Sequence, residues 1–188
     1  MNPSSSNLTH KRVLGVAIPI VLANATIPIL GAVDTGVVGQ MGLAAPIGAV
    51  GIGAIIISAI YWLFGFLRMG TTGLTAQAIG SNDHSETSAL LVRGIIIGLV
   101  AGLILILIQI PLFSAALGIA PASQEVEGLA NEYLKIRVFS APAAIAIFGI
   151  TGWLIANERT RAVLVLMLLI NSINIVLDFV FVLRLGWG

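Results

Sequence analysis

Two aspartates, Asp34 and Asp178, stand inside long apolar stretches and are the side chains best suited to do chemistry. A carboxylate is costly in a hydrophobic membrane segment, and an ionisable residue there usually marks an ion or substrate pathway. Asn171 and Asn174 lie seven and four residues before Asp178, so a helix would carry all three on one polar stripe. Grouped acid and amide oxygens predict a site that exchanges protons as a coupled pair, or one that holds a small cation such as Na+.

Some of these polar residues also have a plainer structural role. Asparagines commonly join membrane helices through interhelical hydrogen bonds, and for Asn171 that role is as well supported as a place in the site. For Asn174, one turn from Asp178, the site is favoured, because helix joining does not explain an ionisable neighbour. Pro19 and Pro28 each free a backbone carbonyl and can kink the first helix, although membrane helices tolerate proline routinely.

Composition indicates that such a site lies in a membrane. Of the 188 residues, 58% are apolar and only 9% are charged, whereas a soluble domain carries roughly 25% charged residues. The net charge of +1, without a basic cluster, argues against a nucleic-acid partner. With no cysteine and two histidines, we expect neither a thiolate nor a histidine metal centre. No GxSxG or HExxH motif occurs, and we expect no organic cofactor and no enzyme activity.

Five long runs with few charges position these residues, and each is long enough for the roughly 20 residues that a membrane helix needs. The prediction is an all-α, polytopic membrane protein, with a cytoplasmic tail over residues 1–12 and a transmembrane lobe over residues 13–188. Gly94, Gly98 and Gly102 have the spacing of tight helix contacts. The expected spans cover about residues 13–38, 43–79, 88–117, 130–156 and 161–185.

The distribution of Lys and Arg predicts the orientation, because bases in short loops favour the cytoplasmic side. The bases expected on the side of the amino terminus are Lys11, Arg12, Arg68, Arg93, Arg159 and Arg161, against Lys135, Arg137 and Arg184 on the other side. We therefore expect a cytoplasmic amino terminus.

The same orientation gives the depth of the two acids. Asp34 lies 22 residues beyond Arg12 and Asp178 lies 17 beyond Arg161, which is about 33 and 26 Å of helix. At these heights the acids can share one cavity in the outer half of the bilayer. Tyr133, near the outer end of the fourth span, is expected to anchor the interface or, alternatively, to line that cavity.

Three segments together resemble the multidrug and toxic compound extrusion (MATE) transporters, most closely the bacterial branch named for DNA-damage-inducible protein F. They are PIVLANATIPILGAVDTGVVGQMG, YWLFGFLRMGTTGLTAQAIG and EYLKIRVFSAPAAIAIFGITGWLIANERTRAVLVLMLLINSINIVLDFVFVLRLGWG. The resemblance implies that Asp34, Asn174 and Asp178 take part in cation coupling, and it places Tyr133 less securely in the same cavity. Family members have twelve helices in two lobes of six. The chain therefore resembles most of one lobe, ending before a sixth helix.

The resemblance implies a lobe of a secondary antiporter in the bacterial inner (plasma) membrane. It would exchange H+, or alternatively Na+, for drugs or amphipathic organic cations. Its partners would be the lipid bilayer, the small-molecule substrate and a carboxy-terminal lobe in the same or a separate chain. The alternatives are a lipid-linked oligosaccharide flippase of the same superfamily, for which few basic residues are present, and a non-transporting subunit or fragment. An intramembrane aspartyl protease would need a GxGD-like motif, which neither acid has.

Overall fold

The computed structural model describes residues 10–39, 44–119 and 122–180 of the chain. These residues form helices joined by short turns, and no strand occurs among them. The all-α prediction is confirmed. In order, the elements are α1 (His10–Gly39), α2 (Ala44–Leu63), α3 (Gly65–Gly80), α4 (His84–Leu107), α5 (Gln109–Ile119), α6 (Gln124–Arg137), the short 3-10 helix η1 (Val138–Ser140), α7 (Ala141–Ala156) and α8 (Thr160–Asp178).

Five segments of the described chain are long and apolar enough to cross a membrane, which confirms a multi-pass membrane protein. They are His10–Val33, Ala44–Gly80, His84–Leu107, Gln124–Ala156 and Thr160–Leu177. Large apolar side chains lie exposed along them, including Trp62 at 80% and Leu107 at 81% of their possible accessible surface. Such a continuous apolar surface suits contact with lipid rather than water.

Two of these spans are built from more than one helix. The second divides at Phe64 into α2 and α3, and the fourth runs from α6 through η1 into α7. The third apolar run forms α4 and then, beyond Ile108, the short helix α5. Residues 1–9 of the expected tail and residues 181–185, the end of the expected fifth span, lie outside the described residues.

The fourth span begins at Gln124, earlier than the expected start near residue 130, because the sequence before it caps the helix. The Ser123 hydroxyl accepts a hydrogen bond from the Val126 amide at 3.4 Å. The Glu127 carboxylate in turn accepts one from the Ala122 amide at 3.0 Å. The first bond satisfies an amide that the first turn of a helix leaves unpaired, and the second ties the residue before the cap to the helix.

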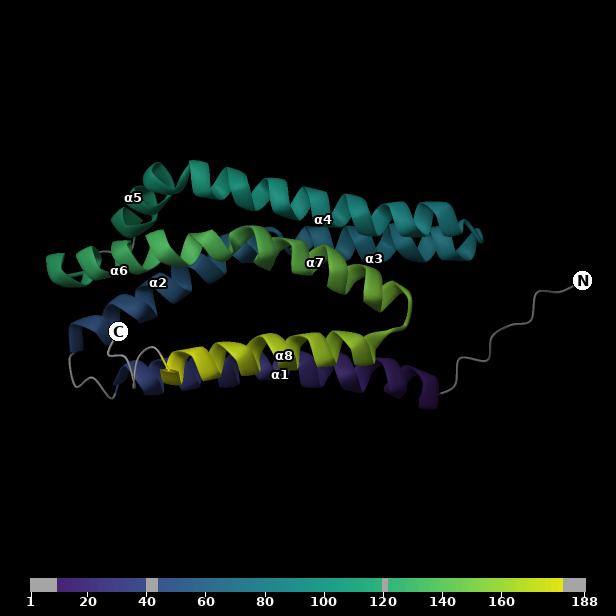
Figure 1. Cartoon of the computed structure of the whole chain (residues 1–188), viewed down its shortest axis with the longest axis horizontal. Coiled ribbons are helices and arrows are strands. Elements are labelled where there is room, and N and C mark those ends of the chain that lie inside the picture. Colours follow the sequence, from purple (N-terminus) through teal and green to yellow (C-terminus); the bar gives the residue numbers. More distant parts are fainter. Residues whose placement is uncertain (1–9, 40–43, 120–121, 181–188) are drawn as a thin grey trace, which may run out of the picture.

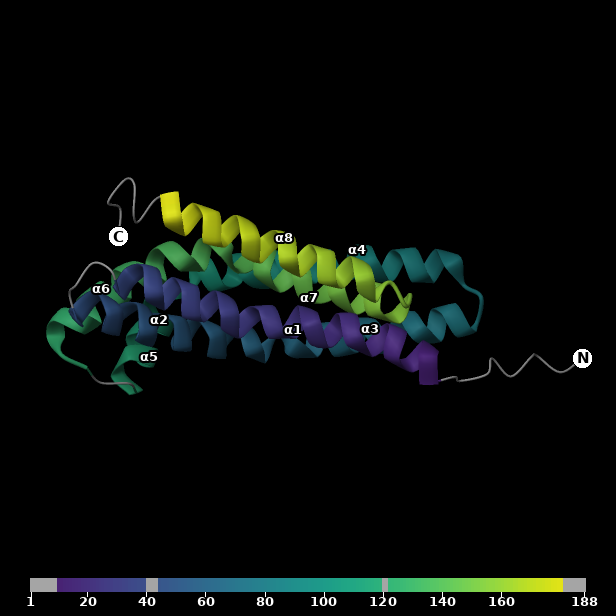
Figure 2. The same cartoon turned by 90° about the horizontal axis from the view of Figure 1, so that it is seen from below.

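The helices fall into two groups. Helices α1 and α8 lie side by side and run in the same direction, while α2 to α7 form the larger body (Figures 1 and 2). The fully buried large apolar side chains lie within that body, on α5, α6, η1 and α7: Phe113, Leu134, Val138 and Ile145. The α1–α8 pair is thus attached to a body that holds most of the core.

Glycines let the backbones of α4 and α7 touch. A Cβ atom added to Gly98 would lie 2.5 Å from the Ala146 backbone, and one added to Gly102 would lie 2.3 Å from that of Pro142. No side chain fits at these distances, so glycine is required for this contact. Lipid provides no hydrophobic driving force between membrane helices. They gain stability from van der Waals packing instead, which small residues favour by letting the backbones approach closely.

Candidate functional site

An ion pair joins the start of α1 to the turn that precedes α8. Arg12 donates from Nη2 to Glu158 Oε1 at 2.6 Å and from Nε to Oε2 at 3.2 Å. Glu158 lies in the turn before α8, where its φ of 56° places it in the left-handed region. Both side chains are about half exposed, so this pair fixes geometry more than it adds stability.

A second contact joins the two helices within the membrane. Asn171 of α8 donates from Nδ2 to the Thr26 hydroxyl of α1 at 2.6 Å. Thr26 donates in turn to the Ala23 carbonyl at 2.7 Å. The hydroxyl is therefore a donor and an acceptor at once, and Asn171 makes the kind of interhelical bond that its residue type allows.

The two contacts give the register of the parallel pair. Arg12 and Glu158 are separated by 146 residues, and Thr26 and Asn171 by 145. The helices therefore advance together, almost residue for residue. When the offset of 145 is continued along α1, residue 34 lies at the height of residue 179, next to Asp178.

The α8 backbone also orients the polar stripe. At 100° per residue, residue 178 lies about 20° around the helix from Asn171, and residue 174 about 60° from it. Because Asn171 contacts α1, these backbone positions lie on the side of α8 that turns toward α1. Asn174 is partly buried. The side chains of Asp34 and Asp178 lie outside the described part of the structure, so the cation site that they are expected to form stays a prediction.

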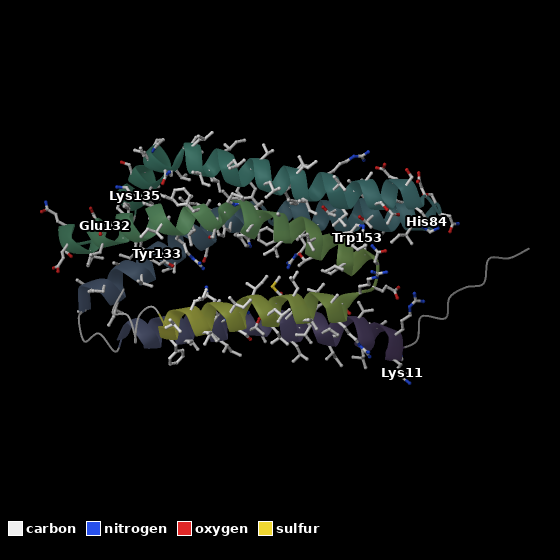
Figure 3. All side chains as sticks on the ribbon, in the orientation of Figure 1. Lys11, His84, Glu132, Tyr133, Lys135 and Trp153 are labelled. Carbon is white, nitrogen blue, oxygen red and sulfur yellow. The ribbon has the colours of Figure 1, made fainter. Side chains whose placement is uncertain are left out.

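The remaining predicted residues occupy separate places. Tyr133 packs its ring against Gly53 of α2, where an added Cβ would lie 2.5 Å from the ring atom Cδ1. Helix α1 continues through Pro19 and Pro28, and the kinks expected there stay predictions. Figure 3 shows Tyr133 and Lys135 toward the α5–α6 end of the molecule, and Lys11 and His84 at the opposite end.

Sequence reasoning did not single out Thr26 or Glu158. Thr26 lies eight residues before Asp34 on α1, so a search for polar residues on the same side of that helix would have found it. Glu158 belongs to the loop NERTR, whose pairing with the start of α1 depends on the fold. Among the described side chains, no three His, Cys, Asp or Glu gather into a metal site.

Comparison with known proteins identifies the family of this chain. A family model described as MatE matches residues 19–180. DNA damage-inducible protein F of Escherichia coli (strain K12) is 38% identical over 170 residues, covering 90% of this chain and 37% of that protein. Multidrug export protein MepA of Staphylococcus aureus (strain bovine RF122 / ET3-1) is 24% identical over 168 residues, covering 89% of this chain and 37% of the relative.

The fold agrees with the sequence comparison. The solved structure of a MOP superfamily transporter from Pyrococcus furiosus superposes with a TM-score of 0.85 at 24% identity, covering 95% of this chain and 39% of the other. The chain thus spans less than two fifths of the length of these three proteins. The resemblance seen in the sequence is confirmed: the chain belongs to the MatE family.

Proposed function

We propose that this chain is part of a secondary antiporter that exchanges a cation, H+ in preference to Na+, for a drug or another amphipathic organic cation. Family membership supports transport, and the name of MepA, a multidrug export protein, supports export as its direction. Alternating access needs two halves that rock around a central site. Because the chain spans about 37% of its curated relatives, the full cycle is assigned to this lobe together with a carboxy-terminal lobe in the same or a separate chain.

The observation that carries the proposal is the shared register of α1 and α8. It brings the backbones of residues 34 and 178 to nearly the same height on neighbouring helices. In the proposed site Asp34 and Asp178 bind the cation, with the Asn174 amide beside them. Asn171 supports the site by holding α8 against α1 through Thr26.

In this cycle the bound cation lowers the free-energy cost of holding the two carboxylates in the membrane. Two carboxylates at one height repel each other and are poorly solvated in the membrane, so a proton or Na+ stabilises a closely packed pair. Release of the cation favours a looser arrangement of α1 against the body. Pro19 and Pro28 give α1 two places to bend. The protein lies in the bacterial inner membrane with its amino terminus in the cytoplasm.

The proposal is tested by Asp34→Asn and Asp178→Asn in the protein that carries this chain. Efflux of a fluorescent organic cation is measured in membrane vesicles under an imposed pH gradient and, separately, under a Na+ gradient. Each substitution is expected to lower gradient-driven efflux about tenfold or more, since it removes an ionisable group that has no substitute in the membrane. Response to the pH gradient rather than the Na+ gradient assigns the ion.

Exposed acids provide the matched controls. Asp83→Asn and Glu132→Gln make the same chemical change at opposite ends of the body, and should leave efflux unchanged. Undiminished gradient-driven efflux in both Asp34→Asn and Asp178→Asn would refute the coupling site. Equal losses in the controls would show that the effect is not specific to the α1–α8 pair.

A further inference from the structure

A pocket of about 650 Å³ opens between α5 and α6, on the other side of the body from the α1–α8 pair (Figure 1). It is therefore separate from the proposed coupling site. Its volume is in the range of small-molecule sites, roughly 300 to 1,000 Å³. The lining that matters for recognition consists of Gln109, Phe113, Leu117, Glu127, Asn131 and Lys135.

The polar part of the lining forms a stripe on α6. Glu127, Asn131 and Lys135 are spaced four residues apart, so they share the helix face that borders α5. Phe113, which is 1% exposed, gives the pocket an apolar floor on α5. The pocket thus offers an acid, an amide and a base above an apolar surface.

The acid and the base are too far apart to satisfy one another. Eight residues of helix separate Glu127 from Lys135, a rise of about 12 Å. The two ion pairs in the described part of the chain, Arg12–Glu158 and Arg93–Glu86, lie at the other end of the molecule. Glu127 accepts a bond from the Ala122 amide through one oxygen, and its carboxylate has capacity for further donors. A ligand that carries a cation and an anion would match both ends.

Membrane depth fixes the direction of that ligand. The span Gln124–Ala156 has 33 residues, which at 1.5 Å each is about 50 Å, longer than the roughly 40 to 45 Å of a bilayer with its headgroups. Because the charged residues of this span lie on α6, we place its first turns in the headgroup layer. Glu127 is nearer the water and Lys135 is deeper, while the long lysine stem lets its ammonium reach back toward the phosphate level.

We propose that this pocket binds the headgroup of a zwitterionic phospholipid that carries a primary amine, phosphatidylethanolamine. In such a lipid the ammonium lies outward of the phosphate, which is the order of Glu127 and Lys135 along α6. The amine donates to Glu127 and the amide oxygens, and the phosphate accepts from Lys135. Phosphatidylcholine carries the cation but no N–H donor for Glu127, and phosphatidylglycerol lacks the cation, so neither matches Glu127 as phosphatidylethanolamine does.

The test is lipid retention by the purified chain, measured by native mass spectrometry after exchange into one detergent with equal amounts of the three lipids. Phosphatidylethanolamine is expected to be retained about five- to tenfold more than the others. The free energy of one charge-assisted hydrogen bond is large enough to give that ratio of affinities. Glu127→Gln should reduce its retention to that of phosphatidylcholine. Lys135→Gln should lower retention of phosphatidylethanolamine and phosphatidylcholine alike.

Glu125→Gln is the matched control, because this exposed acid lies on the first turn of α6 and does not line the pocket. It should retain phosphatidylethanolamine as the unaltered chain does, and size exclusion checks that every variant stays folded. Equal retention of all three lipids by the unaltered chain would overturn the proposal. So would preference for phosphatidylglycerol, which would indicate that a base alone holds an anion.

Discussion

The hydrogen bond between Thr26 and Asn171 joins α1 to α8 inside the membrane. It lies below the proposed cation site on the same two helices. Because Thr26 also donates to Ala23, the bond connects the α8 side chain to the α1 backbone. Small changes here should alter how α1 packs without removing either aspartate.

A double-mutant cycle over Thr26→Val and Asn171→Leu measures this bond. The coupling free energy is expected to be about 0.6 kcal/mol and no more than about 1.7, the range found for interhelical bonds in membranes. It is obtained from reversible unfolding in mixed micelles. Ser172→Ala, at an exposed neighbouring position on α8, should show no coupling to Thr26→Val. Purely additive effects of the two substitutions would contradict the contact.

At this scale the sequence predicted a polar face on α8 but not the residue of α1 that this face meets. The spacing of Asn171, Asn174 and Asp178 predicted one polar face, and Asn171 does face α1. The pairing of Asn171 with Thr26 could not be predicted, because an interhelical bond depends on the register of two helices whose bonded residues are 145 positions apart in the sequence. The pairing of Arg12 with Glu158 could not be predicted for the same reason.

Helices α4 and α7 pack most closely through glycine. The spacing of Gly94, Gly98 and Gly102 predicted a tight contact, whereas the identity of the opposing helix required the fold. Pro142 and Ala146 supply the opposing surface, and Gly149 meets Gly94. This contact holds α4 and α7 together within the body of α2 to α7.

Gly98→Ala should therefore destabilise the body. The new Cβ would meet the Ala146 backbone at 2.5 Å, and overpacking of this kind costs about 1 to 3 kcal/mol. A lower midpoint of thermal unfolding in detergent is the expected result. Gly73→Ala is the matched control on α3, where the added Cβ has no neighbour within 4 Å. An unchanged midpoint for Gly98→Ala would show that α4 and α7 do not pack this closely.

For the whole molecule, composition and the apolar runs predicted the all-α membrane fold and the number of spans, because lipid demands long apolar helices. They could not predict the division into an α1–α8 pair and a larger body, which follows from side-chain contacts between distant segments. The pocket between α5 and α6 was missed as well, since the break at Ile108 that sets α5 apart lies inside one apolar run.

The two ends of the molecule carry different charges, and this asymmetry predicts its orientation. Lys11 and His84 lie at one end (Figure 3), and α6 begins at the other. Arg12, next to Lys11 in the sequence, pairs there with Glu158. The chain has no cysteine, so single cysteines report accessibility cleanly. With the amino terminus in the cytoplasm, Gln124→Cys should react with a membrane-impermeant thiol reagent on intact cells. Ser85→Cys should react only after permeabilisation.

Ser58→Cys controls for exposure to lipid, because this residue is exposed on α2 within the second span and should stay unlabelled in both conditions. Labelling of Ser85→Cys on intact cells, with Gln124→Cys protected, would reverse the orientation. The positions of residues 34 and 178 would then fall in the half of the bilayer nearer the cytoplasm. The proposed cation would have to enter from that side, and the direction of exchange would reverse with it. The lipid pocket would keep its order of charges relative to the nearer membrane surface.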